Sequence, residues 1–127
     1  MSLPKEFNDW INAALPQYPV NFNTSRPDDA DPWFVMSVTS AETFNVTFCN
    51  TGGITEILIS GFGSERYDTF ETMETLRELI ELNLKGALNN YNVFNVMTTG
   101  TISTGTVENQ MNEYTCEIVI SWDNLGV

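Results

Sequence analysis

The sequence predicts a single α+β domain in which two helices pack on an antiparallel sheet. Three observations lead to this fold class. Residues 61–88 hold the only long helical pattern of the chain, and segments with strand-like alternation lie both before and after it. The chain has 127 residues, of which 42% are hydrophobic, which is enough for one core and too little for two. We therefore treat residues 1–127 as one domain.

A short helix is expected from Pro4 to about Leu15. Its apolar residues recur at helical spacing: Phe7, Trp10, Ile11, Ala14 and Leu15. Pro4 suits the first turn and Pro16 ends the helix, because proline lacks the N–H that a helix interior requires. The helix is predicted to lie on the core through Trp10 and its neighbours, and residues 18–23 are predicted to form a brief extended segment after it.

An antiparallel meander of three strands is expected next, over residues 33–39, 43–49 and 54–61. Ala41 and Glu42 would form the tight link of its first hairpin. The sequence Asn-Thr-Gly-Gly before the third strand is a second turn signal. Three consecutive strands on short links make up the first part of the sheet.

The long helix is expected to begin at about Thr69. Asp68 is placed as its N-cap, and Glu71 three residues later completes an acidic version of the capping box. At roughly 100° per residue, one broad apolar arc forms the face that packs on the sheet. That arc contains Phe70, Met73, Leu76, Ile80, Leu84, Ala87 and Leu88. Asn89 and Asn90 are the expected C-terminal stop.

Two leucines of this helix fall outside the apolar arc, and Leu82 is almost opposite its middle. Isolated exposed leucines are common, because much of any protein surface is apolar. The alternative is a second contact surface for a neighbouring subunit. We take Leu79, Leu82 and Thr75 as the candidate subunit interface.

A C-terminal hairpin is expected from strands at residues 91–98 and 111–122, and the second of these alternates most regularly, so we expect it to be central or well covered on one face. Residues 99–110 between them are rich in Thr, Gly and Ser. This stretch is either an ordinary long loop, a continuation of both strands, or an arm that reaches a partner. The candidate partner-contacting residues are Thr99, Ile102, Thr104 and Val107.

Seventeen acidic residues against five basic ones give a net charge of -12. Such a chain repels a phosphate backbone, so sequence-specific nucleic-acid binding is not expected. No apolar run is long enough to span a bilayer and the N-terminus lacks the pattern of a signal peptide, so we expect a soluble intracellular protein. Cys49 and Cys116 lack CxxC spacing and are predicted to be buried free thiols.

The residues that usually carry catalysis are absent or poorly spaced. The chain has no His, which removes the commonest general base and metal ligand. Glu56, Glu113 and Glu117 show no spacing that separates them from surface charges. We therefore expect no enzyme and no cofactor.

Two further patterns suggest ligand sites and do not complete them. Asp28, Asp29 and Asp31 could offer oxygen ligands, but the alternate spacing and central Gly of a calcium loop are missing. Gly61 and Gly63 do not complete a phosphate-binding fingerprint, and we expect them to let the chain turn from strand into helix. No metal site is predicted.

The order helix, meander, long helix, hairpin resembles the tail terminator or tail-completion proteins of long-tailed bacteriophages. The resemblance spans nearly the whole chain. It is carried by PWFVMSV at residues 32–38, by ITEILISGFGSERYDTFETMETLRELI at residues 54–80, and by EYTCEIVISW at residues 113–122.

This resemblance implies a non-catalytic subunit, made in the bacterial host cytoplasm and found in the virion. Six copies would form a ring that caps the tail tube, stops its polymerisation and meets the head-side connector. An acidic lumen would let DNA slide without gripping phosphate.

Two alternatives stay open. The chain could be another head-to-tail joining protein, as a neck or tail tube component. It could also be a small ligand-binding domain, in which aromatic residues and a methionine line a cavity instead of filling the core, although filling is the default expectation. These residues are Phe44, Phe48, Phe62, Phe94 and Met97.

Overall fold

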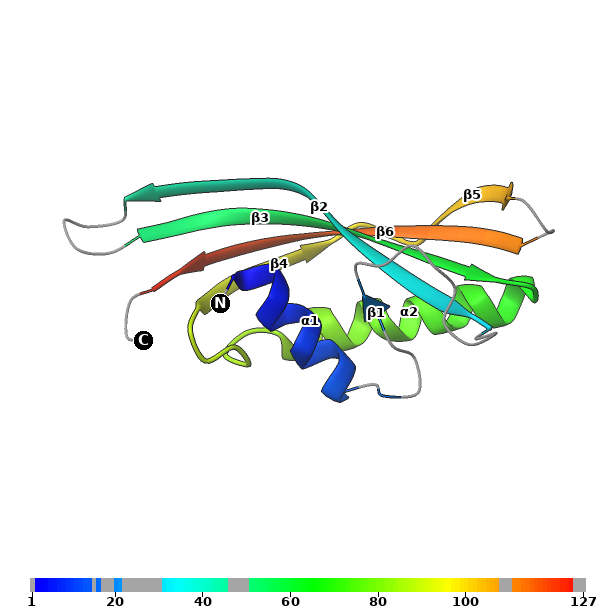
Figure 1. The fold of residues 1–127 in the computed structure, drawn as a ribbon, viewed down its shortest axis with the longest axis horizontal. Helices are drawn as coiled ribbons and strands as arrows, with labels where there is room; N and C mark the ends of the chain where they lie inside the picture. Colours follow the sequence, from blue (N-terminus) through cyan, green and yellow to red (C-terminus); the bar gives the residue numbers. More distant parts are fainter. Residues whose placement is uncertain are drawn as a thin grey trace.

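The computed structural model describes residues 2–14, 16, 20–21, 31–45, 51–107 and 111–124. Helices and strands follow in the predicted order and the α+β class is confirmed (Figure 1). The helices are α1 (Leu3–Ala14) and α2 (Arg66–Asn83). The strands are β1 (Val20–Asn21), β2 (Trp33–Asn45), β3 (Thr51–Gly63), β4 (Asn92–Thr98), β5 (Ile102–Val107) and β6 (Met111–Asp123).

The strands form one sheet in the order β1-β2-β3-β6-β4, and β5 also pairs with β6. Only the short β1–β2 pair is parallel among these strands. Both helices lie on the same face of the sheet, and β2 and β3 extend past them at the left of Figure 1. The expectation that the last strand is central is confirmed, because β6 lies between β3 on one side and β4 and β5 on the other.

The predicted turn at Ala41 and Glu42 is wrong. These residues lie inside β2, paired with Thr55 and Ile54 of β3, and the strand continues to Asn45. The described part of the second predicted strand is therefore the end of β2. Ala41 and Glu42 lack the Gly, Asn or Pro that a two-residue hairpin turn requires, which explains the continuation. The pairing of β2 with β3 shifts register at a bulge between Val38 and Ser40.

Helix α2 begins three residues earlier than predicted. Glu65 is its N-cap, and the backbone N–H of Asp68 donates to Glu65 Oε2 at 2.6 Å. Asp68 lies instead in the first turn, where its negative charge complements the helix dipole. The helix ends at Asn83, well before the predicted stop, and Gly86 follows with φ of 74°. Gly86 lies two residues after the C-cap Leu84, and its left-handed backbone is one that glycine adopts without strain.

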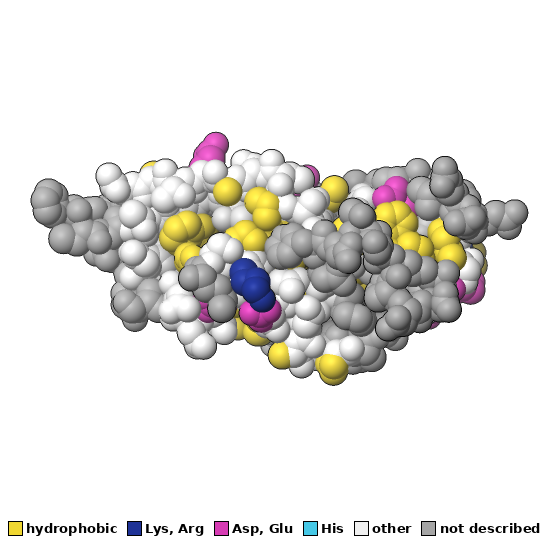
Figure 2. Space-filling model, viewed as in Figure 1, with side chains coloured by type: hydrophobic (Ala, Val, Ile, Leu, Met, Phe, Trp, Pro, Cys, Tyr) yellow, Lys and Arg dark blue, Asp and Glu magenta, His cyan; other side chains and the backbone are white. Residues whose placement is uncertain are grey.

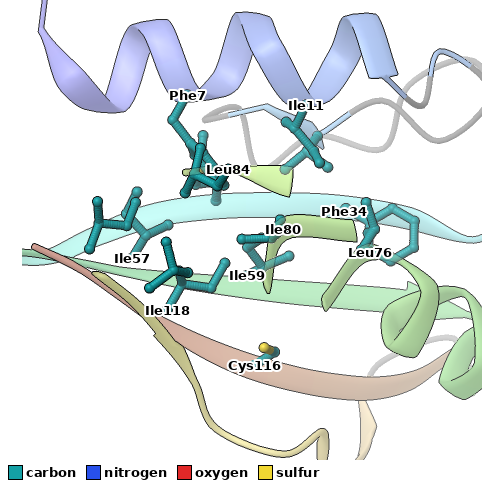
Figure 3. Packing of buried hydrophobic residues seen from close by; sticks show 14 of the residues in the cluster. Phe7, Ile11, Phe34, Ile57, Ile59, Leu76, Ile80, Leu84, Cys116 and Ile118 are labelled. Atoms are coloured by element: carbon teal, nitrogen blue, oxygen red, sulfur yellow. The ribbon is translucent and has the colours of Figure 1, made fainter. Parts of the chain in front are cut away.

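The core lies between the helices and the covered face of the sheet (Figure 3). Full burial of each large aliphatic side chain stabilises the fold by about 1.5–3 kcal/mol. The predicted arc of α2 is buried at Met73, Leu76, Ile80, Leu84 and Leu88. Phe70 is 38% exposed, so its placement in the core was wrong. Its ring packs edge-on against Tyr114 at the rim.

Helix α1 contributes Leu3, Phe7 and Ile11 to this core, and Trp10 is only partly buried against it. The predicted contact of this helix with the core, through Trp10 and its neighbours, is thus made mainly by the neighbours Phe7 and Ile11. Asn12 holds the segment that follows, because its side-chain amide exchanges two hydrogen bonds with the backbone of Val20, at 2.7 and 2.8 Å. These bonds fix β1 beside α1.

Glycines on the covered face of β3 make room for large side chains. A Cβ atom on Gly61 would lie 2.8 Å from Cε1 of Phe34 and 2.9 Å from Cε of Met73. A Cβ on Gly53 would lie 2.8 Å from Cζ2 of Trp122. Gly61 therefore lets the helix and a neighbouring ring approach the strand, and the predicted turn role is wrong at this position because β3 runs to Gly63.

Candidate interaction surfaces

The acidic positions considered for chemistry do not converge. No group of three His, Cys, Asp or Glu side chains that could hold a metal ion occurs among the described residues. Asp31 is engaged by Ser64, whose backbone N–H and hydroxyl both donate to its carboxylate. Asp28 and Asp29 lie outside the described residues. In the pairing of β3 with β6, Glu56 is opposite Val119 and Glu117 is opposite Leu58. The two carboxylates are therefore not cross-strand partners.

Cys116 is confirmed as a buried free thiol, whereas Cys49 lies outside the described residues. Burial raises the pKa of the Cys116 thiol to about 11. Its Sγ is 3.5 Å from the carbonyl oxygen of Thr99. At neutral pH the thiol stays protonated, and a protonated thiol is a poor nucleophile and metal ligand.

The predicted interface residues of α2 differ in exposure. Leu82 is 80% exposed, and Thr75 is exposed with its hydroxyl donating to the carbonyl of Glu71 at 3.0 Å. Leu79 is partly buried and packs against the core. Only Leu82 and Thr75 are thus fully on the outer flank of the helix, and the proposed role in subunit packing stays a prediction.

Arg77 connects α2 to the strand edge. Its guanidinium contacts Glu74 at 2.6 Å and Glu81 at 3.2 Å, and it donates to the hydroxyl of Thr98 at 3.3 Å. The hydrogen bond from Arg77 lowers the pKa of Glu74, and Glu74 in turn raises the pKa of Arg77. This network fastens the helix above the point where β4 ends.

Of the alternatives given for residues 99–110, a continuation of strand structure is what the structure shows in its described part, as β5 (Ile102–Val107). Ile102 pairs with Thr115, and Val107 pairs with Met111, while Thr104 lies at a bulge in β5. Thr99 is fixed to Glu117 by two hydrogen bonds of 2.9 Å, one from each backbone N–H. The stretch therefore follows the edge of the sheet, and contact with a partner through it stays a prediction.

Three of the apolar residues proposed to fill a core or line a pocket are exposed in the structure. Phe44 is 48% exposed, Phe94 52% and Met97 59%, so the default expectation of core filling was wrong for them. Phe62 stacks on Trp33 with ring centroids 5.1 Å apart. Phe48 lies outside the described residues. The strand alternation suggested burial, but these positions lie on edge strands or on the face that no helix covers.

Charge is distributed unevenly over the elements. None of the described strands contains Lys or Arg, and the basic residues that the structure describes lie on or beside the helices. On the face seen in Figure 2, basic side-chain atoms occupy a small area next to acidic ones. Neither described helix is both long and apolar enough to cross a membrane.

These features define a small α+β domain, with both helices on one face of a sheet and exposed apolar residues at the sheet's edges. No family model and no curated protein matches the chain. The fold is similar to that of a chain in a solved structure named "Virion of native gene transfer agent (GTA) particle". The TM-score is 0.67 at 10% sequence identity, and the match covers 96% of this chain and 95% of that chain.

Proposed function

We propose that this chain is a structural protein of a phage-type virion and acts as a tail terminator-like subunit. The observation that carries the proposal is the similarity in fold to a chain of a virion particle over almost the full length of both chains. The sequence resemblance to tail terminators, drawn from separate features, supports the same class. The protein would work by shape and contact, without catalysing a reaction.

In this role several copies, six in the family pattern, form a ring. The ring caps the tail tube and offers its other side to the head connector. The exposed flank of α2, with Leu82 and Thr75, is a candidate for contact between subunits, together with the partly buried Leu79. The edge that contains Thr99, Ile102, Thr104 and Val107 is a candidate for contact with the tube or with a neighbouring subunit.

The charge of the chain suits a ring through which DNA passes. The net charge of -12 and the absence of Lys and Arg from the described strands disfavour a grip on phosphate. As a subunit of the particle, the protein is expected in the virion after its synthesis in the host cytoplasm.

A second candidate function is another joining part of the same particle, a neck or tail tube component. The fold similarity supports this alternative as well, because a virion is a whole particle and the matched chain could be any of its parts. The ligand-binding alternative has no such support, because Phe44, Phe94 and Met97 are exposed.

The test is the mass of the native particle by light scattering, with negative-stain images of the same fraction. A closed ring is expected. Purified tail tube from the same phage should then stop elongating when the ring is added, whereas a neck component would bind without stopping elongation. A monodisperse monomer at high concentration, unable to bind tubes, would rule out both structural roles.

A further inference from the structure

Two parts of the sheet have no outer partner among the described strands: β4, and the portion of β2 that β1 does not reach. Strand β1 pairs with β2 only at Phe34 and Val35, so residues 36–45 of β2 have no described strand on their outer side. Strand β4 forms the opposite edge. An unpaired edge presents a row of N–H and C=O groups that another strand can bind.

The two open edges lie at the same end of the sheet, across the same four strands. Rows of cross-strand partners show this, one made of Phe44, Gly52, Asp123 and Asn92, and another made of Val38, Ile57, Ile118 and Thr98. Residues 38–44 of β2 therefore match β4 in position and in length. The ends of β2 and β3 extend past the helices at the left of Figure 1, whereas β4 lies level with α1 in that view.

The directions of the strands are also complementary. Neighbouring strands alternate in direction from β2 through β3 and β6 to β4. A second copy in the same orientation therefore brings its β2 antiparallel to this β4. All helices then stay on one face of the joined sheet, and the head-to-tail contact repeats from copy to copy. Such a contact forms a ring when its rotation closes.

Charge and exposed apolar residues make the two edges a better site than helix α2 for contact between copies. Helix α2 carries five acidic residues, Asp68, Glu71, Glu74, Glu78 and Glu81, against Arg66 and Arg77, so a contact between copies around Leu82 would be supplementary to one made by the edges. The two edge segments together carry one charged residue, Glu42. They also expose Val38 and Phe44 on β2, and Phe94 and Met97 on β4. A second copy is therefore the fitting occupant.

We propose that copies of this chain join edge to edge, with residues 38–45 of one copy pairing antiparallel with β4 of the next. This inference rests on the proposed ring and names the surfaces that build it. A symmetric β2–β2 contact is the competing arrangement. It would stop at a dimer and leave the β4 edge of each copy unpaired.

The experiment uses two double variants of the full chain. The β2 variant carries Val38→Lys and Phe44→Lys, and the β4 variant carries Phe94→Lys and Met97→Lys. All four side chains are more than 40% exposed, so both variants should fold, which circular dichroism checks. Each variant lowers the net negative charge, so any loss of assembly comes from the edge and not from added general repulsion. Tyr67→Lys, at a side chain 73% exposed on α2, is the matched control.

Each edge variant alone is expected to be monomeric by light scattering at concentrations where the wild type and the Tyr67 control form rings. An equimolar mixture of the two variants should give a dimer, because one intact β2 edge then meets one intact β4 edge. The contact between subunits should weaken at least tenfold in each variant.

Three other outcomes would overturn the inference in distinguishable ways. Rings that persist in both edge variants would leave the proposed function standing and place the contact elsewhere. Loss of assembly in the β2 variant alone would indicate the symmetric β2–β2 contact. A wild type that stays monomeric both alone and with tail tubes would remove the ring itself.

Discussion

Replacing Gly61 by Ala tests whether the helix–sheet contact depends on the absence of a side chain in β3. The added Cβ would lie 2.8 Å from the ring of Phe34 and 2.9 Å from the end of Met73. Both neighbours are 1% exposed. Met73 can move its flexible end, but the ring of Phe34 is enclosed by the core.

The expected magnitude follows from two opposing effects. Forcing one extra carbon into a filled core destabilises a protein by about 1–3 kcal/mol. Removing a glycine stabilises by about 0.4–1 kcal/mol where Ala can adopt the same backbone, and Gly61 has no positive φ. The net loss in free energy of unfolding is about 1–2 kcal/mol, or about 3–8 °C in Tm for a chain of this size.

Urea unfolding followed by tryptophan fluorescence measures this loss. All samples must be at one protein concentration, because assembly adds to apparent stability. Gly100→Ala is the matched control, since a Cβ there meets nothing within 4 Å and the residue is exposed. If the Gly61 variant proves as stable as the Gly100 variant, the close approach of Phe34 and Met73 does not exist in solution.

Three further predictions follow from the surfaces. Leu82→Glu should leave the fold intact and weaken self-association, whereas Leu79→Glu should lower the free energy of unfolding because that side chain is partly buried. Equal stability of the two variants would contradict this. Because Arg77 lowers the pKa of Glu74 in the folded state, the wild type should be more stable than Glu74→Gln above the ordinary pKa of 4.5. That advantage should disappear as the pH falls through the lower folded value, and urea titrations between pH 3 and 7 would show whether it does (about a few tenths of a kcal/mol, since the pair is near the surface). Cys116, with its pKa raised to about 11, should resist iodoacetamide at pH 8 in the folded protein and react in urea. Peptide mass spectrometry locates the label, and rapid labelling without urea would show that the thiol is accessible.

The sequence predicted the elements whose periodicity directly reflects burial. The alternation of β6 and the apolar arc of α2 appear in the structure at Ile118, Ile120, Leu76 and Ile80, all fully buried. Periodicity is a reliable guide here because the sheet is covered on one face only, so alternate residues differ strongly in environment.

Boundaries were predicted less well, because several residues compete for the same local role. Glu65 and Asp68 can both cap a helix, and the choice of Glu65 brings Thr69 and Thr72 into buried positions. The hydroxyls of these threonines donate to backbone carbonyls four residues earlier, at 2.6 and 2.8 Å. Such tertiary placement is not visible in local sequence.

The interaction surfaces were only partly predictable. Leu82 stood out on the helical wheel, and its exposure agrees with that analysis. The exposed Phe44, Phe94 and Met97 did not stand out, because their strands alternate like covered ones. Recognising them requires the order and register of the strands, which show that β4 is an edge and that β1 covers only the start of β2.

The shape of the edges limits how strongly two copies can bind. Each of the two edge segments has a bulge in its pairing with the inner strand, between Val38 and Ser40 in β2 and between Val93 and Asn95 in β4. A bulge twists the edge and interrupts regular pairing, so each contact spans only a few residues and is weak alone.

Closing a ring makes the assembly stable although each single contact between copies is weak. The last contact forms between copies that are already held together, at a high effective concentration, so the closed ring is far more stable than a linear pair. The mixed dimer of the two edge variants should therefore dissociate at concentrations where the wild-type ring persists. If single contacts are weak, a tail tube that holds the first subunits side by side would promote assembly of the ring at the tube.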